Sequence, residues 1–164
     1  MDNNKFPLNY ELSKIPPEAS FGFKRKFDVH TGIDLYCAHQ EPVYAIEDGL
    51  IMKIDWFTGE KAGSQWWNDT QYLGVLGKSG YIIYGEISID GQLKVGDKIS
   101  KGQLCGLVET VLKKDKGRPM NMLHLELYTE FIDDPLVWKI DELKDSRLED
   151  PIKLFQINSS HKHK

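Results

Sequence analysis

Leu73-Gly-Val-Leu-Gly-Lys78, Ser79-Gly80 and Tyr81-Ile-Ile-Tyr84 form the part of this sequence that says most about its fold. Two short apolar runs flank a Ser-Gly pair, and the second consists of aromatic and β-branched residues. Glycine supplies the positive φ that a tight turn between antiparallel strands requires. These twelve positions therefore predict a β-hairpin with its turn at Ser79-Gly80.

Further strand-like runs lie on both sides of this hairpin at regular spacing. Val43–Ile46 and Leu50–Trp56 flank Asp48-Gly49, and Asp-Gly between apolar runs predicts a second hairpin. Very short runs with glycine turns occupy residues 93–106, and Leu123–Tyr128 alternates along its length. Short strands with glycine turns predict an all-β fold, here a two-sheet antiparallel sandwich or barrel-sandwich hybrid.

The two ends of the chain differ from this pattern. Pro135–Ile140 and Pro151–Phe155 each follow an aspartate, which can cap a helix whose first turn accepts the proline, so both are predicted as short helical pieces. Residues 1–20 contain three prolines and little periodicity. We therefore expect an extended arm over residues 1–20, one β domain over residues 21–156 and a disordered polar tail over residues 157–164.

Composition and charge exclude some classes of partner. The 164 residues carry a net charge of −4 with scattered basic residues, so neither nucleic acid nor a membrane is favoured, and Lys24-Arg25-Lys26 is interpreted as solvated surface. Two cysteines, Cys37 and Cys105, do not make a disulfide framework, and their pairing stays open. Residues 1–7 lack the apolar core of a signal peptide, which predicts a cytoplasmic protein. Leaderless export and trimming from a longer chain are the alternatives.

Three separated side chains have the chemistry of a zinc site. His30 and Asp34 lie four residues apart, and His124 lies far away on a strand-like run. Catalytic zinc is held by three such nitrogen or oxygen ligands, and its fourth position stays open for water. Glu126 is on the same face of its strand as His124 and is a candidate acceptor for the hydrogen bond that orients this ligand. The alternative is that Glu126 is an ordinary strand glutamate.

Residues 58–70 do not fit the strand pattern. This segment is polar, contains glycine and includes the pair Trp66-Trp67. We predict a long loop whose tryptophans pack back onto the body of the domain. In the alternative interpretation, Trp66 and Trp67 form a wall of a substrate groove and place their aromatic faces against a ligand.

Taken in order, the motifs resemble the lysostaphin-like (LytM-type) zinc endopeptidases, which cut peptidoglycan cross-bridges. The resemblance covers about residues 21–138 and runs through Phe21-Gly-Phe23, His30-Thr-Gly-Ile-Asp34-Leu, Pro42-Val-Tyr-Ala45, Asp48-Gly49, Tyr84-Gly-Glu-Ile-Ser88, Leu93–Gln103, Met122-Leu-His-Leu-Glu126 and Asp134-Pro-Leu136. Each motif alone is weak, but their order is highly specific. The resemblance implies zinc on His30, Asp34 and His124, a fold of the duplicated hybrid motif type, and a peptidoglycan peptide as ligand.

Two positions depart from the pattern of these enzymes. Where active members have two further histidines beside the metal, this chain has Glu86 and Met122. Methionine carries no proton, so Met122 cannot act as an acid or base and is left as a contact in the substrate groove. Glu86 can act as a general base, as carboxylates do in other zinc peptidases, or it can ligate the metal and close the site.

Three hypotheses about function follow. The first is a zinc-binding domain with impaired or non-standard catalysis, whose groove binds a peptidoglycan peptide or a segment of a partner protein. The second is an active zinc endopeptidase or amide hydrolase on cell-wall peptides, with Glu86 as general base. The third and weakest is a carrier domain, because residues 95–103 resemble half of a biotinyl or lipoyl domain, although the nearest candidate lysine, Lys53, lies in a predicted strand. Neither the substrate nor the oligomeric state follows from the sequence.

Overall fold

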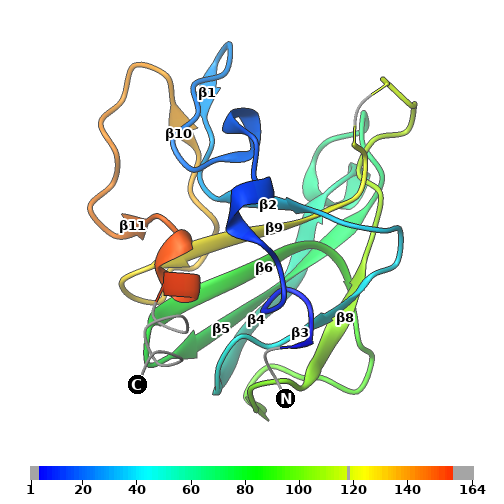
Figure 1. The fold of residues 1–164 in the computed structure, drawn as a ribbon, viewed down its shortest axis with the longest axis vertical. Coiled ribbons are helices and arrows are strands. Elements are labelled where there is room, and N and C mark those ends of the chain that lie inside the picture. Colours follow the sequence, from blue (N-terminus) through cyan, green and yellow to red (C-terminus); the bar gives the residue numbers. More distant parts are fainter. Residues whose placement is uncertain (1–3, 118, 157–164) are drawn as a thin grey trace.

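The structure is a computed structural model that describes residues 4–117 and 119–156. Its regular structure is almost entirely β, as the sequence predicts (Figure 1). The strands are β1 (Asp28–Val29), β2 (Ile33–Tyr36), β3 (Pro42–Tyr44), β4 (Gly49–Thr58), β5 (Thr70–Gly77), β6 (Gly80–Ile89), β7 (Lys98–Ile99), β8 (Leu104–Val108), β9 (Met122–Tyr128), β10 (Trp138–Lys139) and β11 (Leu148–Glu149). Short helical elements are the 3-10 turns η2 (Leu12–Lys14), η3 (Pro17–Ala19) and η4 (Glu60–Ala62) and an α-helix over residues 152–156.

The described strands form one large antiparallel sheet and one small ribbon. Nine strands make up the large sheet, and β1 pairs with β10 in the ribbon. The main path through the large sheet is β11-β9-β6-β5-β4-β7, while β2 pairs with β9, and β8 pairs with both β3 and β6. Strand β6 is the branch point, because residues 81–85 pair with β9 whereas residues 87–89 pair with β8. The sheet therefore divides at Glu86.

One of the two predicted hairpins is present, and the prediction of the other is wrong. Gly77 and Gly80 face each other where β5 turns into β6, so the hairpin is confirmed, with its two turn residues at Lys78-Ser79, one position earlier than predicted. The hairpin predicted at Asp48-Gly49 is absent, because β3 pairs with β8 while β4 pairs with β5 and β7. The backbone of Ala45 bonds instead with the turn around Gln103, whose carbonyl accepts the Ala45 N–H at 2.9 Å. The backbone groups of Ala45 that would pair across the predicted hairpin are therefore already hydrogen-bonded to another segment.

The two predicted helical pieces also have different outcomes. Residues 152–156 are helical, and Asp150 Oδ1 accepts the Ile152 N–H at 3.0 Å, as a capping aspartate does. The helix predicted over Pro135–Ile140 is wrong, because Trp138 and Lys139 form β10 instead. Pairing with β1 gives this segment backbone partners that its local sequence does not reveal.

Strand β6 is buried on both faces, so the sheet separates two apolar cores. On one face Ile82 and Tyr84 contribute to the larger core. On the other face Tyr81 and Ile83 pack with residues that follow β9, including Ile132. Such burial on both sides explains why β6 reads as a continuous apolar run.

The N-terminal segment covers the larger core. Phe6 and Leu154 of the C-terminal helix are buried in that core, and Leu12 and Ile15 pack against it. The described part of the segment contains the turns η2 and η3. The tail predicted over residues 157–164 lies outside the described residues. Among the described residues, no helix has the length and apolar character needed to cross a membrane.

Candidate metal centre

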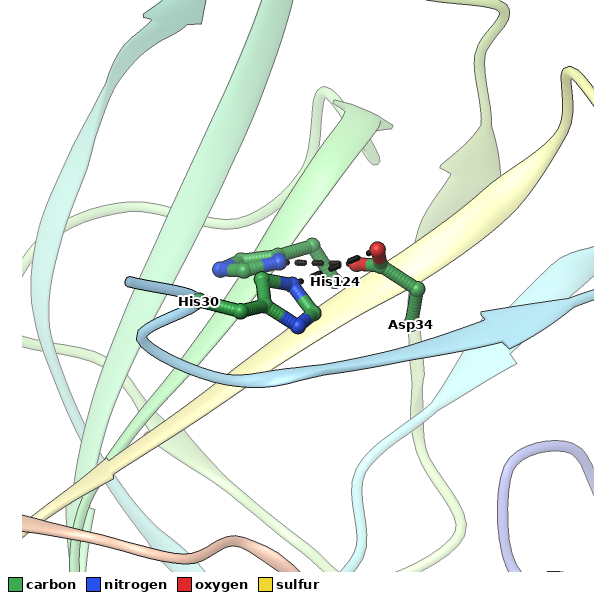
Figure 2. A group of neighbouring side chains, drawn as sticks. All are labelled: His30, Asp34 and His124. Carbon is green, nitrogen blue, oxygen red and sulfur yellow. Dashed lines mark hydrogen bonds and ion pairs between the residues drawn. The ribbon is translucent and has the colours of Figure 1, made fainter. Parts of the chain in front are cut away.

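Pairing between β2 and β9 brings the distant ligand candidates together (Figure 2). Asp34 lies directly opposite His124 in this antiparallel ladder, and His30 precedes the turn that leads into β2. Gly32 permits the close approach, because a Cβ atom there would lie 2.0 Å from the carbonyl oxygen of Leu125. The motif at residues 30–34 thus needs its glycine for packing against β9.

His30, Asp34 and His124 form a compact and buried cluster. His30 Nε2 lies 3.2 Å from Asp34 Oδ2, and His124 Nδ1 lies 2.9 Å from Asp34 Oδ1. One candidate ligand atom from each of the three residues lies within 4.8 Å of the others. The structure therefore brings the three predicted ligands to one point.

Hydrogen bonds on the far side of each imidazole direct a lone pair into the cluster. His30 Nδ1 lies 3.0 Å from the carbonyl oxygen of Ser20, and His124 Nε2 lies 2.7 Å from Glu126 Oε2. Both oxygens only accept hydrogen bonds, so each of these nitrogens donates. In the neutral rings, His30 Nε2 and His124 Nδ1 are then bare and face Asp34, and His30 Nε2 has no hydrogen-bond partner. Two lone pairs and a carboxylate at one point are a donor set that fits a divalent metal such as zinc.

The electrostatics of the cluster favour a positive charge at its centre. Burial opposes ionisation of Asp34, but the adjacent imidazoles of His124 and His30 outweigh it and lower the pKa of this carboxyl. Burial also acts to lower the pKa of His124, yet the hydrogen bonds and charges of Asp34 and Glu126 raise that pKa well above its usual value. A bound metal ion would supply the positive charge that these carboxylates favour.

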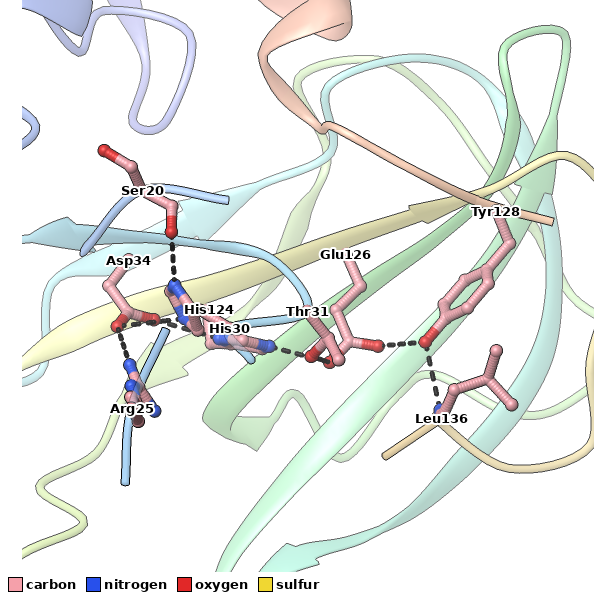
Figure 3. Close-up of polar contacts among 9 residues, drawn as sticks. All are labelled: Ser20, Arg25, His30, Thr31, Asp34, His124, Glu126, Tyr128 and Leu136. Atoms are coloured by element: carbon pink, nitrogen blue, oxygen red, sulfur yellow. Dashed lines mark hydrogen bonds and ion pairs between the residues drawn. The ribbon is translucent and has the colours of Figure 1, made fainter. Parts of the chain in front are cut away.

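Glu126 lies behind His124 in a chain of hydrogen bonds that continues through Tyr128 to Leu136 (Figure 3). Thr31 Oγ1 donates to Glu126 Oε2 at 2.9 Å, and the Tyr128 hydroxyl donates to Glu126 Oε1. The Leu136 N–H in turn donates to the Tyr128 hydroxyl at 3.1 Å. With all of these partners in place, Glu126 holds the ring of His124 in the orientation that turns Nδ1 toward Asp34.

Glu86 occupies a β-bulge beside this cluster. Gln71 faces Ile87 and Tyr72 faces Gly85, so Glu86 is the extra residue between them, with φ of 66°. A non-glycine residue in this left-handed region costs about 1–3 kcal/mol, and bulges re-aim side chains beside active sites. Glu86 Oε1 is shielded from solvent and has no hydrogen-bond partner. Burial, followed by the negative charge of Asp34, raises the pKa of Glu86 above its usual range.

Two cavities meet at the cluster and form one groove. Their volumes are about 620 Å³ and 630 Å³. The residues that line both are Arg25, Asp34, Thr58, Trp67 and Glu86. We call the cavity of about 620 Å³ the acidic arm, because its lining includes Asp28, Asp55 and Asp134. We call the cavity of about 630 Å³ the apolar arm, because its lining includes Phe23, Tyr36, Leu112, Met120 and Met122.

Of the three residues predicted to contact a ligand in the groove, two line it and one does not. Trp67 lines both arms and Met122 lines the apolar arm, whereas Trp66 lines neither and is 76% exposed. Arg25 was interpreted from the sequence as solvated surface, yet its side chain faces the groove. No motif spacing in the sequence predicts that Arg25 lines the groove, because only the folded turn of residues 22–30 brings its side chain there. Cys37 and Cys105 are both free thiols.

Comparison with known proteins agrees with this fold and cluster. Residues 28–134 match the model of peptidase family M23, and no curated protein matches the chain. The catalytic domain of lysostaphin from Staphylococcus simulans is 20% identical, with a TM-score of 0.56 over 84% of this chain and 89% of that chain. The protein cbpa from L. salivarius REN is 17% identical, with a TM-score of 0.58 over 89% of each chain.

A longer structure of lysostaphin, an antimicrobial peptidase, is 22% identical with a TM-score of 0.51, over 78% of this chain and 44% of that chain. This chain therefore spans less than half of that longer protein. At such identities these solved structures show the fold alone. The family match is more specific, because the matched segment exceeds half of the chain and contains His30, Asp34 and His124. With the β fold and the buried cluster that these residues form, it establishes that the chain belongs to peptidase family M23.

Proposed function

We propose that this protein is a zinc-dependent hydrolase of peptide bonds in cell-wall peptides, and that Glu86 handles the proton of the attacking water. The observation that carries the proposal is the solvent-shielded Oε1 of Glu86, which has no hydrogen-bond partner and lines the same cavity as His30, Asp34 and His124. A buried polar atom without a partner is costly unless a ligand or substrate satisfies it. The strained bulge that places this carboxylate beside the cluster adds to that cost.

The division of labour follows from the chemistry of each side chain. His30, Asp34 and His124 would hold the zinc, which would supply Lewis acidity toward the water and the scissile carbonyl. The Glu86 carboxylate accepts a proton from the attacking water while the oxygen of that water bonds to the carbonyl carbon. When the carbon–nitrogen bond breaks, Glu86 returns the proton to the leaving amine. The products are a carboxylic acid and an amine, which become a carboxylate and an ammonium when the acid's proton passes to the amine.

Support for a peptide substrate comes from the groove. Glu86 and Asp34 line both the acidic and the apolar arm, and most of the other lining residues belong to one arm alone, so residues on either side of a scissile bond would have separate walls to contact. The choice of peptidoglycan peptides rests on membership of family M23 and on the resemblance to cross-bridge endopeptidases.

A second candidate function is a zinc-binding domain that binds a peptidoglycan peptide or a protein segment without cleaving it. The observation that favours it is Met122, which lines the apolar arm and offers no proton and no hydrogen-bond donor. In this alternative Glu86 joins the three ligands and closes the metal site, which makes the metal structural.

Removal and return of zinc test the proposal. Protein treated with a chelator is expected to release no new amino groups from purified peptidoglycan, and one equivalent of zinc is expected to restore the release. Amine labelling of the soluble fragments measures the cleavage, and co-sedimentation with peptidoglycan measures binding in the same samples. Zinc-dependent binding without any amine release would favour the second candidate instead.

A further inference from the structure

We propose that the Arg25 guanidinium, held beside Asp34 where the two arms of the groove meet, binds the negative charge that develops on the substrate carbonyl oxygen. This inference rests on the proposed function. Arg25 would supply a cationic hydrogen-bond donor to the substrate, whereas Met122 has no hydrogen-bond donor to offer.

Backbone pairing fixes Arg25 relative to the metal ligand His30. The chain doubles back over residues 22–30, with an isolated bridge between Lys24 and Val29. The Arg25 N–H donates to the Asp28 carbonyl at 2.8 Å, and the His30 N–H donates to the Phe23 carbonyl at 2.9 Å. Pairing of β1 with β10 anchors the same turn. Arg25 is thus carried by a turn whose other strand leads directly into His30.

The Arg25 side chain points to the cluster while keeping its donors available (Figure 3). Its Nη2 lies 3.7 Å from Asp34 Oδ2, which is longer than a hydrogen bond, and its side chain is 46% exposed. Among the described residues, no side-chain hydrogen bond of Arg25 is present. A guanidinium has five N–H donors, so it can contact a substrate oxygen bound next to Asp34.

Other donors along the groove are less suited to this charge. Lys61 lines the acidic arm only, and its ammonium lies 4.4 Å from the centroid of the Trp56 ring. The Thr58 hydroxyl already donates to the Asn68 carbonyl at 2.8 Å. The Tyr72 hydroxyl lines the acidic arm without a partner, but it is neutral, and charged donors bind anions more strongly. Of the lysines and arginines described, Arg25 is the one that lines both arms.

The expected contribution is specific to the transition state. A ground-state carbonyl oxygen carries little charge, whereas the oxygen of the tetrahedral state carries a full negative charge. A fixed cation at that place stabilises the second more than the first, which raises kcat with little effect on KM. The competing explanation is that Arg25 only offsets the charge of Asp34, in which case its loss changes zinc affinity and nothing else.

The test compares neutral and charged replacements of Arg25 with matched neighbours. Arg25→Gln removes the charge, and Arg25→Lys keeps it without the planar fork. Lys24→Ala and Lys26→Ala remove one positive charge each from the same turn, and neither residue lines the groove. The probe is a phosphinic peptide, whose tetrahedral anionic centre mimics the charged oxygen, and it is compared with the uncharged amide peptide of the same sequence.

For Arg25→Gln, we expect kcat on the amide peptide to fall about 10²–10³-fold with KM nearly unchanged. Phosphinate affinity for the zinc-loaded protein should fall by a similar factor, and Arg25→Lys should fall between this variant and the wild type. Zinc affinity, measured by competition with a chromogenic chelator, should stay within a few-fold. Lys24→Ala and Lys26→Ala should match the wild type in all three measurements.

Unchanged phosphinate affinity in Arg25→Gln would overturn the proposal, as would a change confined to zinc affinity. Phosphinate binding does not require turnover, so the result stands even if the wild type cleaves nothing. In that case the proposed hydrolase function fails, while weaker phosphinate binding in Arg25→Gln still supports the anion site. A zinc-loaded wild type that does not bind phosphinate contradicts both.

Discussion

Replacement of Glu86 by glutamine is expected to lower kcat about 10²–10⁴-fold and to leave zinc bound, since a positioned general base contributes a factor of this size. Glutamine keeps the shape of the side chain and its place in the bulge, but it cannot accept the proton of the attacking water. The measurement is amine release from a cell-wall peptide at saturating zinc, together with the zinc content of the dialysed protein.

Glu109→Gln is the matched control for this change. Glu109 is another partly buried glutamate, its N–H donates to the Glu86 carbonyl, and its carboxylate accepts from the Ser88 hydroxyl at 3.1 Å. It lines neither arm of the groove, so its replacement should leave kcat unchanged. Full activity in Glu86→Gln would show that Glu86 is not the base. Loss of zinc from that variant would show instead that Glu86 is a ligand.

Replacement of Asp34 by asparagine is expected to abolish zinc retention and, with it, hydrolysis. The amide keeps the size of the side chain but removes the charge that lies 3.2 Å from His30 Nε2 and 2.9 Å from His124 Nδ1. Loss of an outer partner of a ligand costs about 10–100-fold in metal affinity, and loss of a ligand itself should cost more. Competition with a chelator of known affinity measures the change.

Replacement of two further carboxylates provides zinc affinities with which that of Asp34→Asn can be compared. Asp28 lines the acidic arm but is not a member of the cluster, so Asp28→Asn should bind zinc as the wild type does. Glu126→Gln should weaken zinc binding about 10–100-fold, because the amide no longer fixes the ring of His124 as a carboxylate does. Equal zinc affinity in Asp34→Asn and the wild type would remove Asp34 from the metal site.

Much of the fold could be predicted because its strands are encoded locally. The Ser79-Gly80 hairpin follows from a turn residue between two β-rich runs, and those runs pair as expected. The Asp48-Gly49 turn carries an equally strong local signal, yet its flanking strands find other partners. Partner choice depends on tertiary contacts, here the bonds of Ala45 to the turn at Gln103, which no local pattern contains.

The candidate metal cluster was also predictable, but its surroundings were not. His30, Asp34 and His124 are of ligand type and lie in a recognisable order, and the β2–β9 ladder brings them together. The bulge at Glu86 arises where β6 changes partner from β9 to β8, which is a property of the whole sheet. Arg25 was missed because a turn and a ribbon partner from β10, over a hundred residues away, place it at the groove.

The coordination sphere of zinc in the loaded protein tests the central claim most directly. A crystal structure of the zinc-loaded protein is expected to show His30 Nε2, His124 Nδ1 and an Asp34 oxygen at about 2.0–2.2 Å from the metal, with the fourth position open to solvent. Glu86 should lie beside that position without bonding to the metal. A zinc ion ligated by Glu86 as well as the other three side chains would contradict the account, because a closed site leaves no place for the reacting water.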